Sequence, residues 1–260
     1  MLELFSRIGE RVLGGFYRLG EATLLILRVF GELPHIWRVH RETVAQMIRI
    51  GIGSMPLVAV TSLFTGMVLA VQTSYQIEEY VPEIFIASAV CKATIIELGP
   101  VITALVISGR VGASIAAELG TMRVTEQIDA LETMAVDPVR FLLLPRFFSG
   151  LVMMPVIVTF GCLIAIAGGY AVCLLYLEMS SVAFFQGMRQ FVYPYDIYSG
   201  LLKSFIFGGT ISLVGCYYGY CTSQGAEGVG RATTQSVVTN CLLILIFDYF
   251  LAMLLFPTAG

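Results

Sequence analysis

Long apolar stretches recur along the chain and predict five membrane-spanning helices. Each stretch reaches the roughly 20 residues that a helix needs to cross a bilayer. The segments between them contain most of the charged residues. The five predicted spans are Ile52–Ser74, Ile84–Ser108, Phe148–Leu177, Ile197–Cys221 and Val237–Phe256. We therefore expect an all-α membrane protein with a five-span domain over residues 50–260.

The composition favours the same fold class. Hydrophobic residues make up 57% of the 260 residues and charged residues only 13%, whereas soluble domains contain about 25% charged residues. A soluble chain of this length cannot cover so much apolar surface, so lipid must solvate part of it. The net charge of −3 gives no basic excess for nucleic acid, which we do not expect as a partner.

Residues 1–49 form a separate N-terminal helical segment in this interpretation. The apolar stretch Ala22–Leu33 is too short to span a bilayer, and Arg38 and Arg41 follow it near Trp37. This pattern is typical of a helix that lies in the membrane interface. We expect an interfacial or re-entrant helix that forms an elbow before the first span, and a simple membrane anchor is the alternative.

Basic residues are distributed very unevenly between the predicted loops. Residues 1–49, the loop after the second span and the loop after the fourth span together contain twelve arginines, whereas the opposite side contains only Arg189. The side of the membrane with more basic residues is normally the cytoplasmic one. We therefore expect a cytoplasmic N-terminus and a C-terminus outside. On the outer side, residues 180–195 are expected to form a short interfacial helix.

Small residues follow two helical rows after the second span. They are Gly109, Ala113 and Ala117 in one row, and Gly112, Ala116 and Gly120 in the other. Rows of this kind let helix backbones approach closely in a membrane. The pattern predicts close packing, either inside the subunit or between subunits.

A cytoplasmic helix is predicted over about residues 121–137. Its apolar positions fall on one face, and Pro138 ends it. Those positions are Val124, Ile128, Leu131 and Ala135. The helix is expected either to dock onto a partner or to rest on the bilayer. Directly after it, Arg140 and Arg146 are expected to meet lipid phosphates at the interface.

Four ionisable residues lie inside the predicted spans, where such residues are costly and usually face a protein interior or a wet cavity. They are Lys92, Glu97, Lys203 and Asp248. At 1.5 Å per residue, Lys203 lies about 9 Å from the outer end of its span, Lys92 and Asp248 about 12 Å, and Glu97 about 20 Å. We expect Lys92 or Lys203 to pair with Asp248. The four residues form either a structural ion-pair layer or part of a lipid cavity.

The apolar wall of such a cavity is expected near the outer end of the first span, at Leu69, Val71 and Tyr75. The glycine-rich stretch 223–231 is expected to be a tight cytoplasmic turn, and a loop that cradles phosphate is the alternative. With two histidines and no cysteine–histidine cluster, we expect neither a metal site nor catalytic residues.

Two long motifs resemble the MlaE family of ABC-transporter permeases. They are GRVGASIAAELGTMRVTEQIDALETMAVDPVRFLLLPR, residues 109–146, and YYGYCTSQGAEGVGRATTQSVVTN, residues 217–240. The resemblance implies a homodimeric permease subunit in the inner membrane of Gram-negative bacteria. It further implies that the complex moves phospholipids between the inner and outer membranes and maintains outer-membrane lipid asymmetry.

The same resemblance implies three kinds of partner: a cytoplasmic ATPase (MlaF-like), a STAS-domain protein (MlaB-like) and a periplasmic MCE-domain hexamer (MlaD-like). The cytoplasmic helix becomes the coupling helix that seats in the ATPase. Its contact residues are then Arg123, Glu126, Gln127, Asp129, Ala130, Leu131, Glu132 and Met134.

The two lysines of the chain, Lys92 and Lys203, do not follow the glycine pattern of a phosphate-binding P-loop. We therefore expect ATP and magnesium on a separate ATPase subunit and no cofactor on this chain. A secondary transporter or channel that works without an ATPase is the alternative, and a passive scaffold for the periplasmic ring is another.

Overall fold

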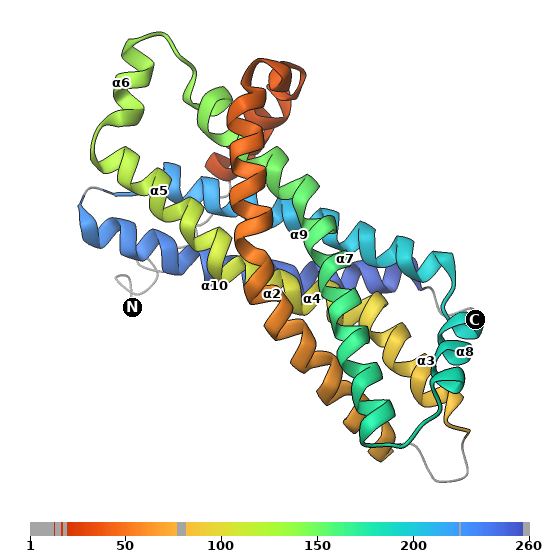
Figure 1. Ribbon diagram of the computed structural model, residues 1–260. Coiled ribbons are helices and arrows are strands. Elements are labelled where there is room, and N and C mark those ends of the chain that lie inside the picture. The colour runs from red at the N-terminus through yellow and green to blue at the C-terminus, as the bar shows by residue number, and fades with distance from the viewer. Residues whose placement is uncertain (1–12, 14–16, 18–19, 77–81, 224, 257–260) are drawn as a thin grey trace, which may run out of the picture.

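The computed structural model describes residues 13, 17, 20–76, 82–223 and 225–256. Within these residues the chain is helical and contains no strand (Figure 1). The elements are η1 (Leu33–Val39), α2 (His40–Gln76), α3 (Ile84–Ala93), η2 (Thr94–Leu98), α4 (Gly99–Ile107), η3 (Ser108–Gly112), α5 (Ala113–Val124), α6 (Gln127–Thr133), η4 (Val139–Leu143), α7 (Leu144–Leu175), α8 (Ser181–Phe191), α9 (Pro194–Tyr220) and α10 (Ala226–Leu255).

Five helical stretches of the described residues are long and apolar enough to cross a membrane, which confirms the predicted number of spans. They are Leu33–Gln76, Ile84–Val124, Val139–Leu175, Pro194–Tyr220 and Ala226–Leu255. Four of the five begin or end well outside the predicted apolar stretch on the predicted cytoplasmic side. Hydropathy detects only the part of a helix that lipid surrounds, and the hydrogen-bonded backbone continues into the polar segments.

The second span is one long helix interrupted by two wider π turns, η2 and η3. Pro100 follows η2 and has no N–H, so a regular α-helix would lose a hydrogen bond and its ring would clash with the preceding turn. In the wider turn the Gly99 N–H reaches the Thr94 carbonyl instead. Such π turns occur often at functional sites, and η2 carries Glu97.

The closest helix crossing joins α2 and α7 through glycines. A Cβ atom added at Gly66 would lie 1.8 Å from the carbonyl oxygen of Ala165, and one at Gly168 would lie 2.6 Å from the carbonyl oxygen of Leu63. Because only glycine fits, the two backbones touch directly, as is common between membrane helices. This crossing forms the middle of the molecule in Figure 1.

One of the two predicted rows of small residues packs inside the chain. A Cβ atom at Gly112 would meet Asn240 of α10, and one at Gly120 would meet Thr222 after α9. Ala116 of the same row is fully buried. The other row is open at Gly109, where nothing lies within 4 Å of an added Cβ atom. The row of Gly112, Ala116 and Gly120 is therefore a packing surface within the subunit.

The cytoplasmic helix is shorter than predicted. Helix α5 ends at Val124, and Glu126 takes a left-handed conformation (φ 60°) before α6 begins at Gln127. A second left-handed residue, Ala135 (φ 59°), follows the end of α6. The prediction of one helix through Val136 is therefore wrong. The break at Glu126 re-aims the chain so that Ile128 becomes fully buried, and its burial offsets the cost of the strained backbone.

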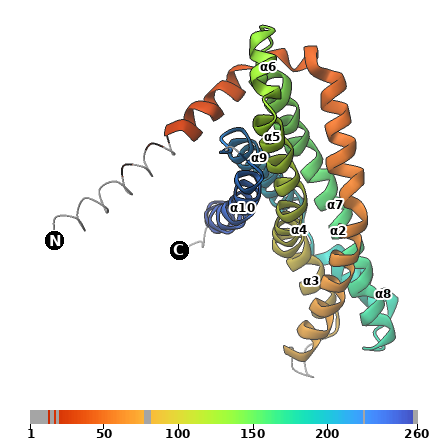
Figure 2. The ribbon, with the colours of Figure 1, turned by 90° about the vertical axis from the view of Figure 1, so that its left-hand side faces the viewer.

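The described part of the N-terminal segment packs against the bundle. Residues 20–31 are helical, and Leu25 and Val29 join the main hydrophobic core. Phe30 contacts Phe147 of α7 edge to face, with ring centroids 5.3 Å apart. Figure 2 shows this stretch inclined to the bundle, joined to α2 through η1. Its other face is apolar and exposed, at Leu24 and Leu27. Helix α2 continues without a break through residue 49.

Helix α8 is the short amphipathic helix expected between the third and fourth spans. Ser180 caps it by accepting a hydrogen bond from the Val182 N–H. Phe184 is buried, and Gly187 approaches the Ile84 carbonyl of α3 so closely that an added Cβ atom would lie 2.5 Å from it. Phe184 also contacts Tyr170 of α7, so the helix holds the Ile84 end of α3 against α7.

Candidate functional site

Lys203 is the centre of an ion-pair network inside the membrane-spanning region. Its side chain is fully buried, and its Nζ atom lies 2.5 Å from Oε2 of Glu97 and 2.8 Å from Oδ1 of Asp248. The network joins η2, α9 and α10. Of the two pairings expected for Asp248, with Lys92 or with Lys203, the structure contains the one with Lys203. One ammonium group faces two carboxylates, so the network keeps its full hydrogen bonding only while all three residues are present.

Glu97 is the exposed edge of this network. Its side chain is 42% exposed, against 13% for Asp248. The depth estimate from the sequence placed Glu97 about 11 Å deeper than Lys203, which is wrong because the two residues are in contact. The estimate assumed that both spans start at one level, whereas α3 starts farther out than α9 and lies against α8 (Figure 1).

Lys92 does not reach Asp248. Its Nζ atom lies 3.7 Å from Oδ2 of Asp196 and 5.4 Å from the ring centroid of Tyr193. Asp196 also accepts a hydrogen bond from the Tyr193 N–H, and so caps the start of α9. Asp196 was not among the predicted site residues. Its position three residues after Tyr193, with Pro194 first in the helix, is a recognisable N-cap signal.

Two apolar hollows flank the C-terminal half of α2. One, of about 580 Å³, is lined by Val71, Tyr75 and Val172 among others. The other, of about 410 Å³, is lined by Leu69 together with Leu98 and Ile102 of the second span. Leu69 and Val71 therefore face different hollows, as expected for helix positions two apart. The hollow at Leu69 adjoins the turn that carries Glu97.

At the other end of the spans, Glu118 of α5 binds two arginines from different helices. Arg49 of α2 lies 2.5 Å from its Oε1 atom, and Arg146 of α7 lies 3.4 Å from its Oε2 atom. Arg146 is only 6% exposed and also donates to the Leu142 carbonyl oxygen. The prediction that Arg146 meets lipid phosphates is therefore wrong, because its guanidinium is buried and binds Glu118 and the Leu142 carbonyl oxygen instead.

Arg140 ties the N-terminal segment to the start of the third span. Its Nε atom lies 2.6 Å from Oε2 of Glu32, which also faces His35 at 3.2 Å. The hydrogen bond from Arg140 holds the pKa of the Glu32 carboxyl below its ordinary value. Arg140 thus has a protein partner where the sequence predicted a lipid phosphate.

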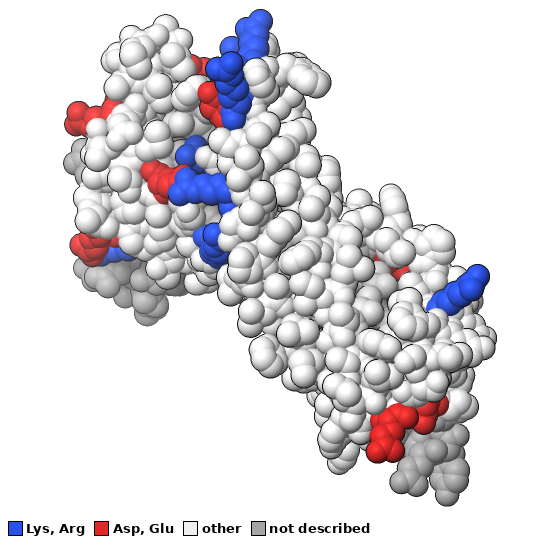
Figure 3. All heavy atoms as spheres, viewed as in Figure 1, with Lys and Arg blue, Asp and Glu red and all other residues white. Residues whose placement is uncertain are grey.

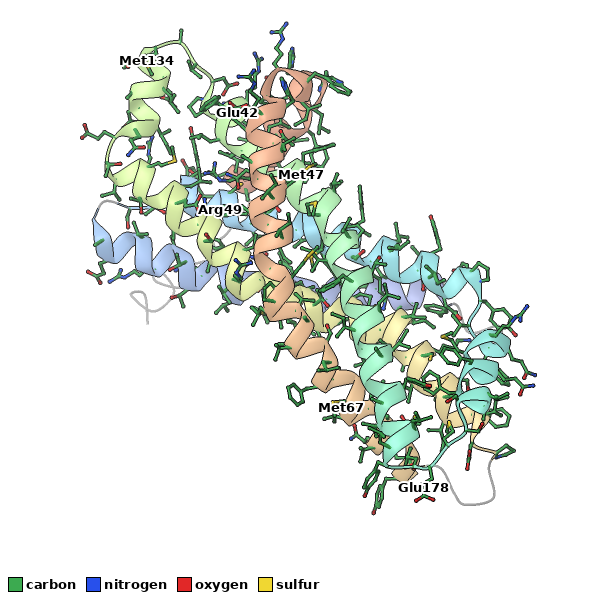
Figure 4. All side chains as sticks on the ribbon, viewed as in Figure 1. Glu42, Met47, Arg49, Met67, Met134 and Glu178 are labelled. Carbon is green, nitrogen blue, oxygen red and sulfur yellow. The ribbon has the colours of Figure 1, made fainter. Side chains whose placement is uncertain are left out.

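Helix α6 presents one buried and one exposed face. Ile128 is buried and Leu131 packs against the main core. Arg123 binds Asp129 at 2.6 Å and stacks on Tyr220, whose hydroxyl group donates to Glu132. The remaining predicted contact residues are exposed: Glu126, Gln127, Ala130 and Met134. The exposed face is therefore free to bind another protein, and Figure 4 labels Met134 at this end of the molecule, opposite Glu178.

Charged side chains gather at the two ends of the visible face, with an uncharged band between them (Figure 3). The end with α5 and α6 contains most of the arginines, as the sequence predicted for the cytoplasmic side. The band matches the apolar surface that lipid would contact.

The family model described as Permease MlaE matches residues 43–254. A probable ABC transporter permease protein of Rickettsia prowazekii (strain Madrid E) is 45% identical over 213 residues, 82% of each chain. A probable ABC transporter permease protein of Synechocystis sp. is 36% identical over 251 residues, 96% of this chain and 93% of the relative.

The Intermembrane phospholipid transport system permease protein MlaE of Haemophilus influenzae is 33% identical over 257 residues, 98% of each chain. The residues matched by the family model contain both motifs on which the resemblance rested and most of each of the five spans. The chain is an integral membrane protein and belongs to the MlaE permease family.

Proposed function

We propose that this protein is the membrane-spanning subunit of an ABC transporter that moves phospholipids between the inner and outer membranes of a bacterium and so maintains outer-membrane lipid asymmetry. The similarity to the phospholipid transport permease of Haemophilus influenzae along 98% of both chains carries this proposal. The buried network at Lys203, beside an apolar hollow, supports it.

The outer half of the spans is the proposed lipid cavity. The hollows lined by Leu69, Val71 and Tyr75 accept acyl chains, and Lys92 and Lys203 act on the phosphate. Glu97 has an exposed edge in an apolar span, where facing hydrocarbon would be costly. A second copy of the chain covers this edge together with the apolar face of α10, so the cavity lies within a homodimer. Asp248 of α10 then lines the same cavity.

The exposed face of α6 is the proposed coupling surface. It receives a cytoplasmic ATPase, which holds the ATP and magnesium, and a STAS-domain protein binds that ATPase. A periplasmic MCE-domain hexamer covers the outer end. The N-terminus is cytoplasmic and the C-terminus periplasmic, in keeping with the twelve arginines that the sequence assigns to the cytoplasmic segments. The stretch 20–31 lies in the cytoplasmic interface as an elbow helix, with Leu24 and Leu27 in lipid.

Affinity purification from native membranes in mild detergent, followed by mass spectrometry of proteins and lipids, tests the proposal. A co-purifying P-loop ATPase and bound phospholipid are expected. The variant Ala130→Arg, on the exposed face of α6, should lose the ATPase, and Glu178→Gln at the opposite end should keep it. A protein that purifies alone, under conditions that preserve other membrane complexes, would contradict the proposal.

A further inference from the structure

A small polar hollow opens between α2 and α5 at the end of the molecule opposite the lipid cavity. Its volume is about 90 Å³, and its polar lining consists of Gln46, Arg49, Arg110, Ser114 and Glu118. Arg110 and Glu97 are thirteen residues apart on the second span, or about 20 Å along the helix. The hollow is therefore separate from the network at Lys203.

Positive charge exceeds negative charge around this hollow. Glu118 is the acidic residue of the lining, and it is already shared between Arg49 and the buried Arg146. Among the described residues, no carboxylate lies within 4 Å of the Arg110 guanidinium, whose recorded partner is the hydroxyl group of Ser54 at 2.5 Å. Two guanidinium groups thus share the one carboxylate while that of Arg110 has none, and the surplus positive charge favours an anion.

The backbone is shaped to hold Arg110 in this position. A Cβ atom added at Gly53 would lie 2.9 Å from Nη2 of Arg110, so glycine leaves the space that the guanidinium fills. Arg110 itself projects from the π turn η3. A guanidinium has five N–H donors in a planar fork that matches a phosphate. The bond to Ser54 uses Nη1 and leaves donors available for a ligand.

The hollow lies at the depth of the lipid head groups on the predicted cytoplasmic side. Arg49 is the last charged residue of α2 before the uncharged stretch 50–76. Ser54, which holds Arg110, is little more than one helical turn farther in, about 7 Å. Figure 4 places Arg49 on the side of α2 that faces α5. An arginine at this depth is stable when an anion neutralises it, and the phosphates of the cytoplasmic leaflet lie at the same level.

We propose that this hollow binds the phosphate group of a phospholipid from the cytoplasmic leaflet, with Arg110 and Arg49 as its ligands. The choice of a phospholipid as the ligand rests on the proposed function. The site adds a second lipid-binding position on the opposite side of the membrane. The shared chemistry is a phosphate group, which a lipid or free phosphate could supply. A lipid is favoured because the hollow opens beside the apolar surface of α2, where Ile48 and Ile52 are exposed.

Site-specific photo-crosslinking in cells tests the site without requiring transport. A benzophenone amino acid replaces Gln46, which lines the hollow, in cells grown with radioactive phosphate. Benzophenone inserts into C–H bonds, so free phosphate cannot be captured. Phospholipase C should release the label from a lipid attached through its acyl chain or glycerol, and phospholipase D from one attached through its head group. The same amino acid at Ile48, on the outer side of α2, reports bulk lipid. Both positions are compared with and without Arg110→Gln.

We expect Arg110→Gln to lower the label at position 46 about tenfold, the factor for a lost hydrogen bond to a charged group, and to leave the label at position 48 unchanged. Arg110→Lys, which keeps the charge, should retain about half of the label. Arg231→Gln, in the exposed first turns of α10, should have no effect; α10 already begins at Ala226, so the expected turn over residues 223–231 is shorter than predicted. Protein amount is checked by immunoblot, so a folding defect appears at both positions.

Equal labelling at position 46 with and without Arg110 would overturn the proposal, and so would a label that neither phospholipase C nor phospholipase D releases. In a competition experiment, inorganic phosphate is added to the purified protein before cross-linking. If it abolishes the lipid label at position 46, the site belongs to the free ion, and the proposal of a lipid site is overturned. If the protein captures lipid in an Arg110-dependent way but transfers no lipid, the proposed binding site is supported and only the proposed function is contradicted.

Discussion

The ammonium nitrogen of Lys203 lies 2.5 Å from the Oε2 atom of Glu97, although the two residues are 106 positions apart in the sequence. This contact joins the π turn of the second span to the fourth span. Because Asp248 binds the same ammonium group from the fifth span, one buried cation holds three helices and two carboxylates together.

The variant Lys203→Ala should therefore destabilise the protein. It leaves two carboxylates near each other in an apolar region, and removing one partner of a buried ion pair costs about 3–5 kcal/mol. We expect low abundance and a lower melting temperature in detergent, measured by a fluorescence-based thermal shift.

The neutral triple variant Lys203→Met, Glu97→Gln, Asp248→Asn separates stability from function. With no unpaired charge left, its abundance and melting temperature should return close to wild type. Lipid transfer should stay at about a tenth of wild type or less, the effect of losing one charged hydrogen-bond partner of the phosphate. Normal transfer by this variant would reduce the network to a structural role.

The crossing of α2 and α7 allows a matched glycine test. Gly66→Ala places a methyl group against the Ala165 backbone, and we expect a loss of more than about 2 kcal/mol in unfolding free energy, since overpacking a tight interface costs about 1–3 kcal/mol. Gly109→Ala meets nothing within 4 Å and should be neutral or stabilising by up to about 1 kcal/mol. Equal effects in thermal unfolding would contradict the assigned crossing.

Glu32 should control the docking of the N-terminal segment. The pKa of its carboxyl is lowered, chiefly by the hydrogen bond from Arg140. A lowered folded-state pKa means that the contribution is complete above the ordinary value of 4.5 and is lost as the pH falls below it. The fluorescence of Trp37, the one tryptophan of the chain, should report this transition. Glu32→Gln should abolish the acid step and increase tryptic cleavage at Arg28, whereas Arg38→Gln should do neither.

The two faces of α6 should respond differently to a charge. Ile128→Asp buries an unpaired carboxylate and should unfold or displace the helix, with a lower melting temperature. Ala130→Arg lies on the exposed face, so thermal stability should stay within about 0.5 kcal/mol of wild type. Its expected effect is the loss of ATP-driven transfer. A stable Ala130→Arg protein that transfers lipid normally would place the coupling surface elsewhere.

The number of spans and their order could be predicted from the sequence because lipid imposes a minimum length of apolar helix. That Asp248 pairs with a lysine could also be predicted, since a buried cation needs an anion, but the choice between Lys92 and Lys203 could not. The partner of Lys92 was missed because Asp196 lies one residue outside the predicted fourth span, where it was read as a loop residue.

Long-range geometry limited the remaining predictions. The contact of Glu97 with Lys203 depends on how far α3 starts beyond α9, and the hydropathy of the two spans does not contain that offset. The assignment of Arg146 failed because its partner Glu118 lies 28 residues earlier, on a different helix. The break at Glu126 also escaped prediction, since glutamate is a helix-forming residue and tertiary packing of Ile128 overrides its preference.

The most direct test of the proposed function is lipid transfer by the co-purified complex in liposomes. The protein and its partners are reconstituted with a fluorescent phospholipid, and transfer to acceptor vesicles is followed with ATP and with a non-hydrolysable analogue. We predict transfer that requires ATP hydrolysis and that falls at least about tenfold in the neutral triple variant. Transfer at equal rates with both nucleotides, or ATP hydrolysis with no movement of lipid, would contradict the assignment of this chain as a phospholipid permease.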